Sequence, residues 1–118
     1  MRYQILIYNN PEFDEGFNGA LRGEVDSTHA TIIRELTEAG ELIATDALST
    51  EAAVVVRTDA RTHRVHTTDG PFIETKEWVG GFYLVDVANI DRAVEIAGRF
   101  VEARYSPIEV RQLEHDPS

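Results

Sequence analysis

The side chains best suited to chemistry gather in Asp69–Gly81, which reads Asp-Gly-Pro-Phe-Ile-Glu-Thr-Lys-Glu-Trp-Val-Gly-Gly. This stretch holds the only lysine of the chain, Lys76, and the only tryptophan, Trp78. Lys76 could bind a substrate carboxylate or serve as an acid, while Glu74 and Glu77 keep it protonated and oppose a nucleophilic role. The alternative is a structural ion cluster that fixes a connecting loop, as most such charge clusters do.

His29 is the best candidate for a general base, because histidine titrates near working pH and a nearby carboxylate can fix its tautomer. It precedes Ile32 and Ile33 by three and four residues, so it lies on the inner side of the helix expected there. The alternative, and the commoner case, is a helix-face histidine with a structural hydrogen bond.

Turn-forming residues open the polar stretch and glycines close it. Asp69 is expected to accept hydrogen bonds from the following amides, with a role as carboxylate partner as the less favoured option. Gly70 is free to adopt an unusual φ, and Pro71 fixes its own. Gly80 and Gly81 leave the backbone bare, which permits close approach by another chain or a ligand.

The sequence predicts no metal site and no cofactor. His63 and His66 are three residues apart on an expected strand, so they point to opposite faces and cannot share one ion. The chain has no cysteine, which excludes a disulfide scaffold and a thiol nucleophile. It also lacks a Walker loop, a dinucleotide glycine fingerprint and a nucleophile elbow.

Length and net charge limit the number of domains and the kinds of partner that we expect. At 118 residues the chain is expected to form a single domain spanning residues 1–118. Its net charge of −10 and its ten dispersed arginines argue against a nucleic-acid partner. We see no signal peptide and no segment of transmembrane length, so we expect a cytoplasmic protein with no membrane partner.

The apolar spacing predicts strands, helices and one hairpin. A helix is expected over Asp26–Ala39, capped by Asp26, Ser27 or Thr28 and ended by Gly40. A second is expected over Ile90–Phe100, capped by Asn89, with Ile90, Ala93, Val94, Ala97 and Phe100 as its inner stripe. The expected strands are Arg2–Tyr8, Leu42–Leu48, the hairpin pair Ala53–Thr58 and Arg64–Thr68, then Phe82–Val87 and Ile108–Leu113. Residues Glu12–Glu24 are expected to form a loop with a short, weak helix.

This order fits an α+β fold, a ferredoxin-like split β-α-β sheet with an extra hairpin and both helices on one face. Two strands are apolar on both faces, Arg2–Tyr8 and Phe82–Val87, and the face away from the helices has no cover within the chain. An uncovered apolar face marks an interface, so we expect a homodimer whose two sheets face each other.

The run TDGPFIETKEWVGGFYLVDV, with the opening MRYQILIY and the ending ARYSPIEVRQL, closely resembles the DGPF-domain branch of the YciI-related family over nearly the whole chain. The resemblance implies a dimeric α/β barrel. Some similar proteins carry out elimination or dehalogenation on small cyclic acids. Other members are encoded beside, or fused to, sigma factors of the extracytoplasmic-function type.

The resemblance also implies site residues. The phrase STHATIIRELTEAGELIA resembles the family's histidine-bearing helix, with His29 at the matching position. The acidic partner usually follows the second helix in an Asp-Pro phrase, but here the chain reads GRFVEARY, with Val101 near the expected place and Glu102 next to it. Asp69 would replace that partner if its loop folds over His29. The residues that match the family motif directly are Asp69, Gly70, Pro71, Phe72, Glu74, Lys76, Glu77, Gly80, Gly81 and, in the last strand, Arg111.

Two functions follow from these observations. The first is a pocket for a small organic acid with cofactor-free lyase or isomerase chemistry, in which His29 and Asp69 are catalytic and Lys76, Arg111, Glu74 and Phe72 bind the substrate. The second is a non-catalytic module that senses a ligand or binds a partner in sigma-factor-linked regulation.

Overall fold

The computed structural model describes residues 1–17, 19–70 and 76–117, and it is an α+β domain. One four-stranded antiparallel sheet has the order β2-β5-β1-β6, and a separate two-stranded ribbon pairs β3 with β4. This order is consistent with the expected ferredoxin-like fold. The strands are β1 (Arg2–Asn9), β2 (Leu42–Ala47), β3 (Val54–Thr58), β4 (Val65–Asp69), β5 (Trp78–Asp86) and β6 (Ile108–Gln112); the helices are α1 (Pro11–Phe17), α2 (Arg22–Glu38), α3 (Ile90–Gly98) and the 3-10 turn η1 (Val101–Arg104).

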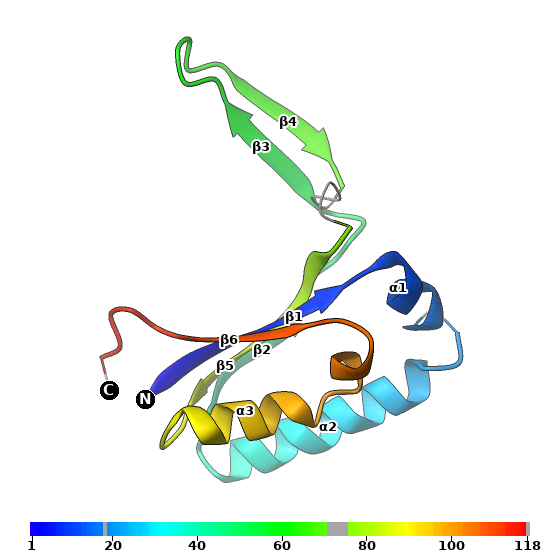
Figure 1. Cartoon of the computed structure of the whole chain (residues 1–118), viewed down its shortest axis with the longest axis vertical. Helices are drawn as coiled ribbons and strands as arrows, with labels where there is room; N and C mark the ends of the chain where they lie inside the picture. The colour runs from blue at the N-terminus through cyan, green and yellow to red at the C-terminus, as the bar shows by residue number, and fades with distance from the viewer. Residues whose placement is uncertain (18, 71–75, 118) are drawn as a thin grey trace.

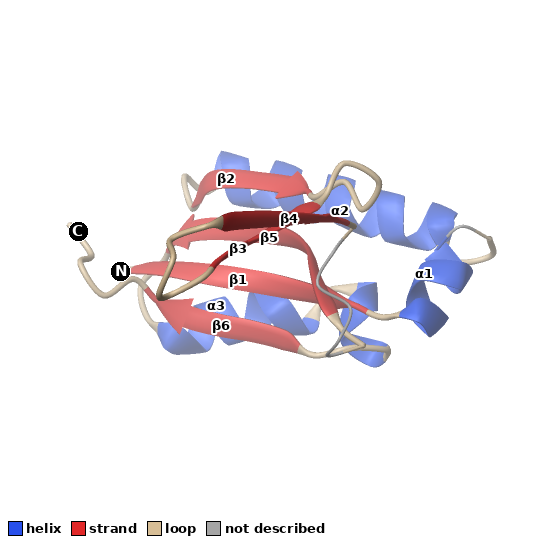
Figure 2. Cartoon of the chain, turned by 90° about the horizontal axis from the view of Figure 1, so that it is seen from above, coloured by secondary structure: helices blue, strands red, loops and turns tan. Residues whose placement is uncertain are grey.

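The core lies between the sheet and helices α2 and α3, which cover the same face of it (Figure 1). Alternate residues of the two central strands point into this core, namely Tyr3, Ile5 and Ile7 from β1 and Tyr83 and Val85 from β5. The residues between them are only partly buried, and they include Leu6, Phe82 and Leu84. Figure 2 looks onto this other face, with the helices behind the sheet. The predicted two-faced strands and one-sided helices are therefore confirmed.

Helix α2 begins earlier than the sequence predicts. It begins at Arg22, four residues before the predicted capping residues, and its N-cap Leu21 makes no side-chain hydrogen bond. Asp26, Ser27 and Thr28 lie inside the helix, so capping potential misplaced the boundary. The predicted end is confirmed, because Gly40 has φ of 72° and the backbone amide of Glu41 donates to the carbonyl of Leu36.

Helix α3 confirms its predicted cap, since the side chain of Asn89 accepts a hydrogen bond from the backbone amide of Arg92. The predicted inner stripe is partly wrong. Ile90 and Val94 are 44% and 54% exposed, whereas Ile96, which the stripe omitted, is fully buried. The helix ends at Gly98, two residues before the predicted end at Phe100, and the chain then continues into the 3-10 turn η1.

Strand β5 is longer than predicted, because it begins at Trp78 rather than Phe82. The two glycines allow this extension. A Cβ atom on Gly80 would lie 3.2 Å from the Cβ of Asn9, and one on Gly81 would lie 3.2 Å from the backbone oxygen of Asp46. The close approach predicted for these glycines is therefore made by neighbouring strands of the same sheet.

The β3–β4 ribbon projects away from the domain on the side opposite the helices (Figure 1). Its hairpin pairing is as predicted, with Val56 opposite Thr67. The Cα radius of gyration is 16.2 Å, whereas a compact chain of this length has about 13–14 Å. In the described ranges, no helix is long and apolar enough to cross a bilayer.

Candidate functional site

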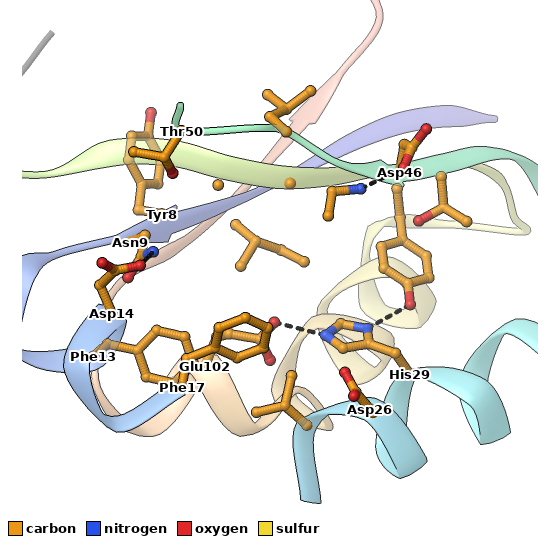
Figure 3. Close-up of a pocket in the computed structure, with 18 of the residues that line it drawn as sticks. Tyr8, Asn9, Phe13, Asp14, Phe17, Asp26, His29, Asp46, Thr50 and Glu102 are labelled. Carbon is orange, nitrogen blue, oxygen red and sulfur yellow. Dashed lines mark hydrogen bonds and ion pairs between the residues drawn. The ribbon is translucent and has the colours of Figure 1, made fainter. Parts of the chain in front are cut away.

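A chain of three polar side chains lies between the sheet and the helices. The Nδ1 atom of His29 is 2.6 Å from the hydroxyl oxygen of Tyr83, and its Nε2 atom is 2.6 Å from Oε2 of Glu102 (Figure 3). Both distances are slightly shorter than the usual range for hydrogen bonds to nitrogen. The inward orientation predicted for His29 is thus confirmed, and both nitrogens of its ring have partners.

Three separate elements bring these side chains together. His29 lies in the second turn of α2, Tyr83 lies in the middle of the central strand β5, and Glu102 lies in η1. The ring of Phe100 packs against both other rings, with centroids 5.1 Å from His29 and 4.8 Å from Tyr83. The backbone carbonyl of Glu102 accepts from the amides of Tyr105 and Ser106, so the turn that carries this carboxylate is itself fixed.

Burial raises the pKa of the Tyr83 hydroxyl to about 12, since it disfavours the charged form. The negative charge of Glu102 adds to this rise in pKa, and a hydrogen bond with Thr45 opposes it. Tyr83 therefore keeps its proton at neutral pH and can donate it to Nδ1 of His29. The network then assigns the ring proton to Nε2, which donates to the carboxylate of Glu102.

Glu102 is the most deeply buried carboxylate of the site, with 7% of its surface exposed. Only Oε2 has a partner. Its other oxygen, Oε1, is shielded from solvent and receives no hydrogen bond within the described part of the chain. A buried oxygen without a donor costs free energy, and such groups gather at functional sites.

Beside the three polar side chains lies a cavity of about 390 Å³, which we call the His29 cavity. Its volume falls in the range of about 300–1,000 Å³ that is usual for small-molecule sites. Aromatic, aliphatic and acidic side chains dominate its lining. They include Tyr8, Phe13, Phe17, Tyr83, Ile7, Val25, Ile33, Asp14, Asp26, Asp46 and Glu102, with Gly80 and Gly81 at the sheet.

Other residues predicted for the site lie elsewhere. Asp69 ends β4 in the projecting ribbon, Lys76 is exposed with φ of 60°, and Arg111 is exposed on β6 opposite Gln4. None of Asp69, Lys76 and Arg111 lines the His29 cavity. The structure therefore does not bring them to His29 within one chain.

The remaining motif residues have separate positions. Gly70 has φ of 90°, which confirms the unusual φ predicted there. Glu77 lines a second cavity, at the base of the ribbon, together with Trp78. Pro71, Phe72 and Glu74 lie outside the described residues. The described ranges contain no group of three or more side chains that could hold a metal ion.

Sequence reasoning missed two members of the polar chain. Tyr83 lies in the strand predicted over Phe82–Val87, where the alternation indicates only an apolar face. Glu102 follows Val101, and the apolar spacing predicts a helix that ends just before them at Phe100. The signal that could have found Glu102 is an acid that directly follows two apolar residues, Phe100 and Val101, at the end of a predicted helix.

The fold and this site define a small α+β domain with an enclosed polar chain beside a ligand-sized cavity. The YCII-related domain matches residues 1–114, so the chain belongs to the YCII-related family. It is also 35% identical, over 116 residues, to an uncharacterized protein of Rhizobium meliloti (strain 1021). The matched region covers 96% of this chain and 92% of that relative. The family expected from the sequence is thereby confirmed, and the relative's name assigns no activity.

Proposed function

We propose that the His29 cavity binds a small organic molecule and that Tyr83, His29 and Glu102 transfer a proton to and from it, in a lyase or isomerase reaction without a cofactor. The observation that carries this proposal is the continuous pair of 2.6 Å contacts on the two nitrogens of one histidine, beside a cavity of ligand size. Geometry of this kind relates a reacting group, a base and an orienting carboxylate.

The proton moves in two linked steps. The Tyr83 oxygen accepts a proton from the substrate while its own proton passes to Nδ1 of His29. The resulting imidazolium is stabilised by the Glu102 carboxylate on Nε2. The electron pair left on the substrate either expels a leaving group, as in a lyase, or takes a proton back at another atom, as in an isomerase. His29 then returns the proton through Tyr83.

In this scheme the expected base, His29, acts through Tyr83, and Glu102 takes the place that the sequence assigned to Asp69. The acid-binding residues expected from the sequence, Lys76 and Arg111, lie away from the cavity, so we do not assign them to substrate binding. The high pKa of Tyr83 suits the scheme, because the hydroxyl must stay protonated to donate to His29.

The relay can be tested by nitrogen NMR of the imidazole rings at mildly alkaline pH. His29 should hold its proton on Nε2, whereas the exposed His63 and His66 serve as internal references with mixed tautomers. Glu102→Gln should move the His29 proton toward Nδ1 or mix the tautomers. A His29 ring with the tautomer mixture of the reference rings in the unmodified protein would rule the relay out.

Activity can be tested by following proton exchange from a panel of small carbon acids in heavy water. Exchange or elimination should be lost in Tyr83→Phe and His29→Gln and kept in Glu38→Gln, an exposed acid outside the cavity. Turnover that survives both Tyr83→Phe and His29→Gln would refute the assignment.

We also propose that the open face of the sheet pairs with a second copy of the chain. Leu6 and Phe82 lie opposite each other in register on that face and are only partly buried in one chain. Phe82→Glu should shift the mass measured by light scattering from dimer to monomer. Val94→Glu is the matched control, because Val94 is 54% exposed on the helical side. A monomer in the unmodified protein at micromolar concentration would refute the pairing.

Partner binding by the ribbon is a second candidate function. Val54, Val56 and Val65 are 57–64% exposed on it, and a lone two-stranded ribbon is marginally stable. The partner expected from the resemblance is a sigma factor of the extracytoplasmic-function type. Complex formation with such a factor should be lost in Val56→Asp and kept in Val94→Asp. Binding that survives Val56→Asp would exclude the ribbon as its site.

A further inference from the structure

The His29 cavity has a one-sided charge. Three aspartates and Glu102 line it, and the aspartates are Asp14, Asp26 and Asp46. None of the eleven basic residues lines it, although all eleven lie in the described part of the chain. Asp26 has a cationic partner outside the lining, since Nε of Arg22 lies 3.1 Å from its Oδ2 atom. An anionic ligand would therefore meet the repulsion of these carboxylates and no lysine or arginine side chain to bind it.

The second observation is the unpartnered oxygen of Glu102. The carboxylate lines the cavity and is buried, yet Oε1 has no donor in the described ranges. Oε2 is already engaged by His29. A ligand group that supplies N–H donors would satisfy this oxygen, whereas a ligand that offers only acceptors would not.

The rest of the lining suits an apolar body next to a cation. Phe13, Phe17 and Tyr8 place aromatic rings around the cavity, and Figure 3 shows them on the side of Glu102 and Asp14. The faces of aromatic rings attract a positive charge, and carboxylates beside such rings are the usual surroundings of bound ammonium groups. Ile7, Val25 and Ile33 supply aliphatic contacts.

We propose that the ligand of the His29 cavity is an organic amine, with its protonated nitrogen held by the acidic side chains and an apolar or aromatic body of modest size against the rings. The proposal deepens the proposed function, since it names the substrate class of the same cavity. It replaces the organic acid expected from the sequence. The net charge of −10 acts in the same sense, because it raises the local concentration of cations around the protein.

The test uses three probes that share a phenyl body and differ in charge: 2-phenylethylamine, 2-phenylethanol and 3-phenylpropionate. Each is titrated into the full chain, and the dissociation constant is measured from amide chemical shifts of the cavity residues. The amine should bind at least about tenfold more tightly than the alcohol, because charge-assisted hydrogen bonds are about twice as strong as neutral ones. The carboxylate should bind most weakly.

Substitutions locate the effect in the cavity. Asp46→Asn should weaken the amine several-fold and leave the alcohol unchanged, whereas Glu38→Gln, an exposed acid on α2 outside the cavity, should change neither. Asp14→Asn provides a second variant if Asp46→Asn folds poorly. Equal binding of the three probes, preference for the carboxylate, or no cavity shift with the amine would each overturn the proposal. The proton relay is tested separately, by the tautomer of His29 in the NMR experiment.

Discussion

Replacing Tyr83 by Phe removes one hydroxyl group from the site and leaves the packing of the ring in place. Tyr83 is 2% exposed, and its oxygen is 2.6 Å from Nδ1 of His29. At neutral pH the variant should lose about 1–2 kcal/mol of unfolding free energy, the usual cost of one hydrogen bond whose partner stays partly buried. Phe fits the same space, so no cavity adds to this cost.

The stability difference between the two proteins should shrink in alkali and come close to zero near pH 11. The pKa of Tyr83 is raised from 10.0 in the unfolded chain to about 12 in the folded one. The stability linked to this shift is complete below pH 10 and is lost as pH rises through the folded pKa, because the unfolded tyrosine releases its proton first. By pH 11 the unfolding free energy of the unmodified protein should fall by about 1.4 kcal/mol through this titration. Tyr83→Phe has no phenol at this position, so its unfolding free energy should not show that fall.

Urea unfolding of both proteins between pH 8 and pH 11 measures this difference, and the other titrating groups cancel because both proteins share them. Tyrosinate absorbance provides an independent readout. The chain has four tyrosines, so the spectrum of the unmodified protein minus that of Tyr83→Phe isolates the titration of one phenol. A stability difference that stays constant from pH 8 to pH 11, or a phenol that titrates near pH 10, would refute the buried, hydrogen-bonded hydroxyl.

Four further substitutions test the site and the fold that supports it. Glu102→Gln should lower kcat by about 10²–10⁴, because the residue orients the base and stabilises its charged form; steady-state kinetics on the substrate found in the exchange assay measures this. Arg92→Ala should cost about 1 kcal/mol in urea unfolding, since its guanidinium donates two hydrogen bonds to Glu41, at 2.8 and 3.1 Å. Gly81→Ala should cost about 1–3 kcal/mol in the same assay, because the new Cβ would lie 3.2 Å from a backbone oxygen of β2. Gly23→Ala, inside α2 with nothing within 4 Å, should instead stabilise by about 0.5–1 kcal/mol.

The sequence predicted the sheet and its burial well, because these depend on period-two alternation. Tyr3, Ile5 and Ile7 fall on the core side of β1 as expected, and the same alternation places Tyr83 and Val85 in β5. The boundaries of α2 were harder to predict. Its first turn contains Gly23 and has no side-chain cap, so local propensity argued for a later start than tertiary packing permits.

The candidate site could not be assembled from the sequence for a geometric reason. His29 and Glu102 are separated by 73 positions, and Tyr83 by 54 from His29, so their contacts depend on how α2 and η1 pack against β5. The sequence predicts a site around Lys76 because charged residues are dense there. Local density is visible in one dimension, whereas a buried polar contact between distant elements is visible only after the sheet and helices are placed.

Glu102 is the acidic partner of His29, although the resemblance places that partner near Val101. Helix α3 ends at Gly98, and Phe100 has extended backbone angles, so the chain re-enters the core as a 3-10 turn rather than a continued α-helix. In this turn the carboxylate of Glu102 contacts Nε2 of His29. Val101 meanwhile packs with Phe13 and Val25 in the smaller apolar cluster. The turn thus fills the core with one side chain and supplies the charge to the site with the next.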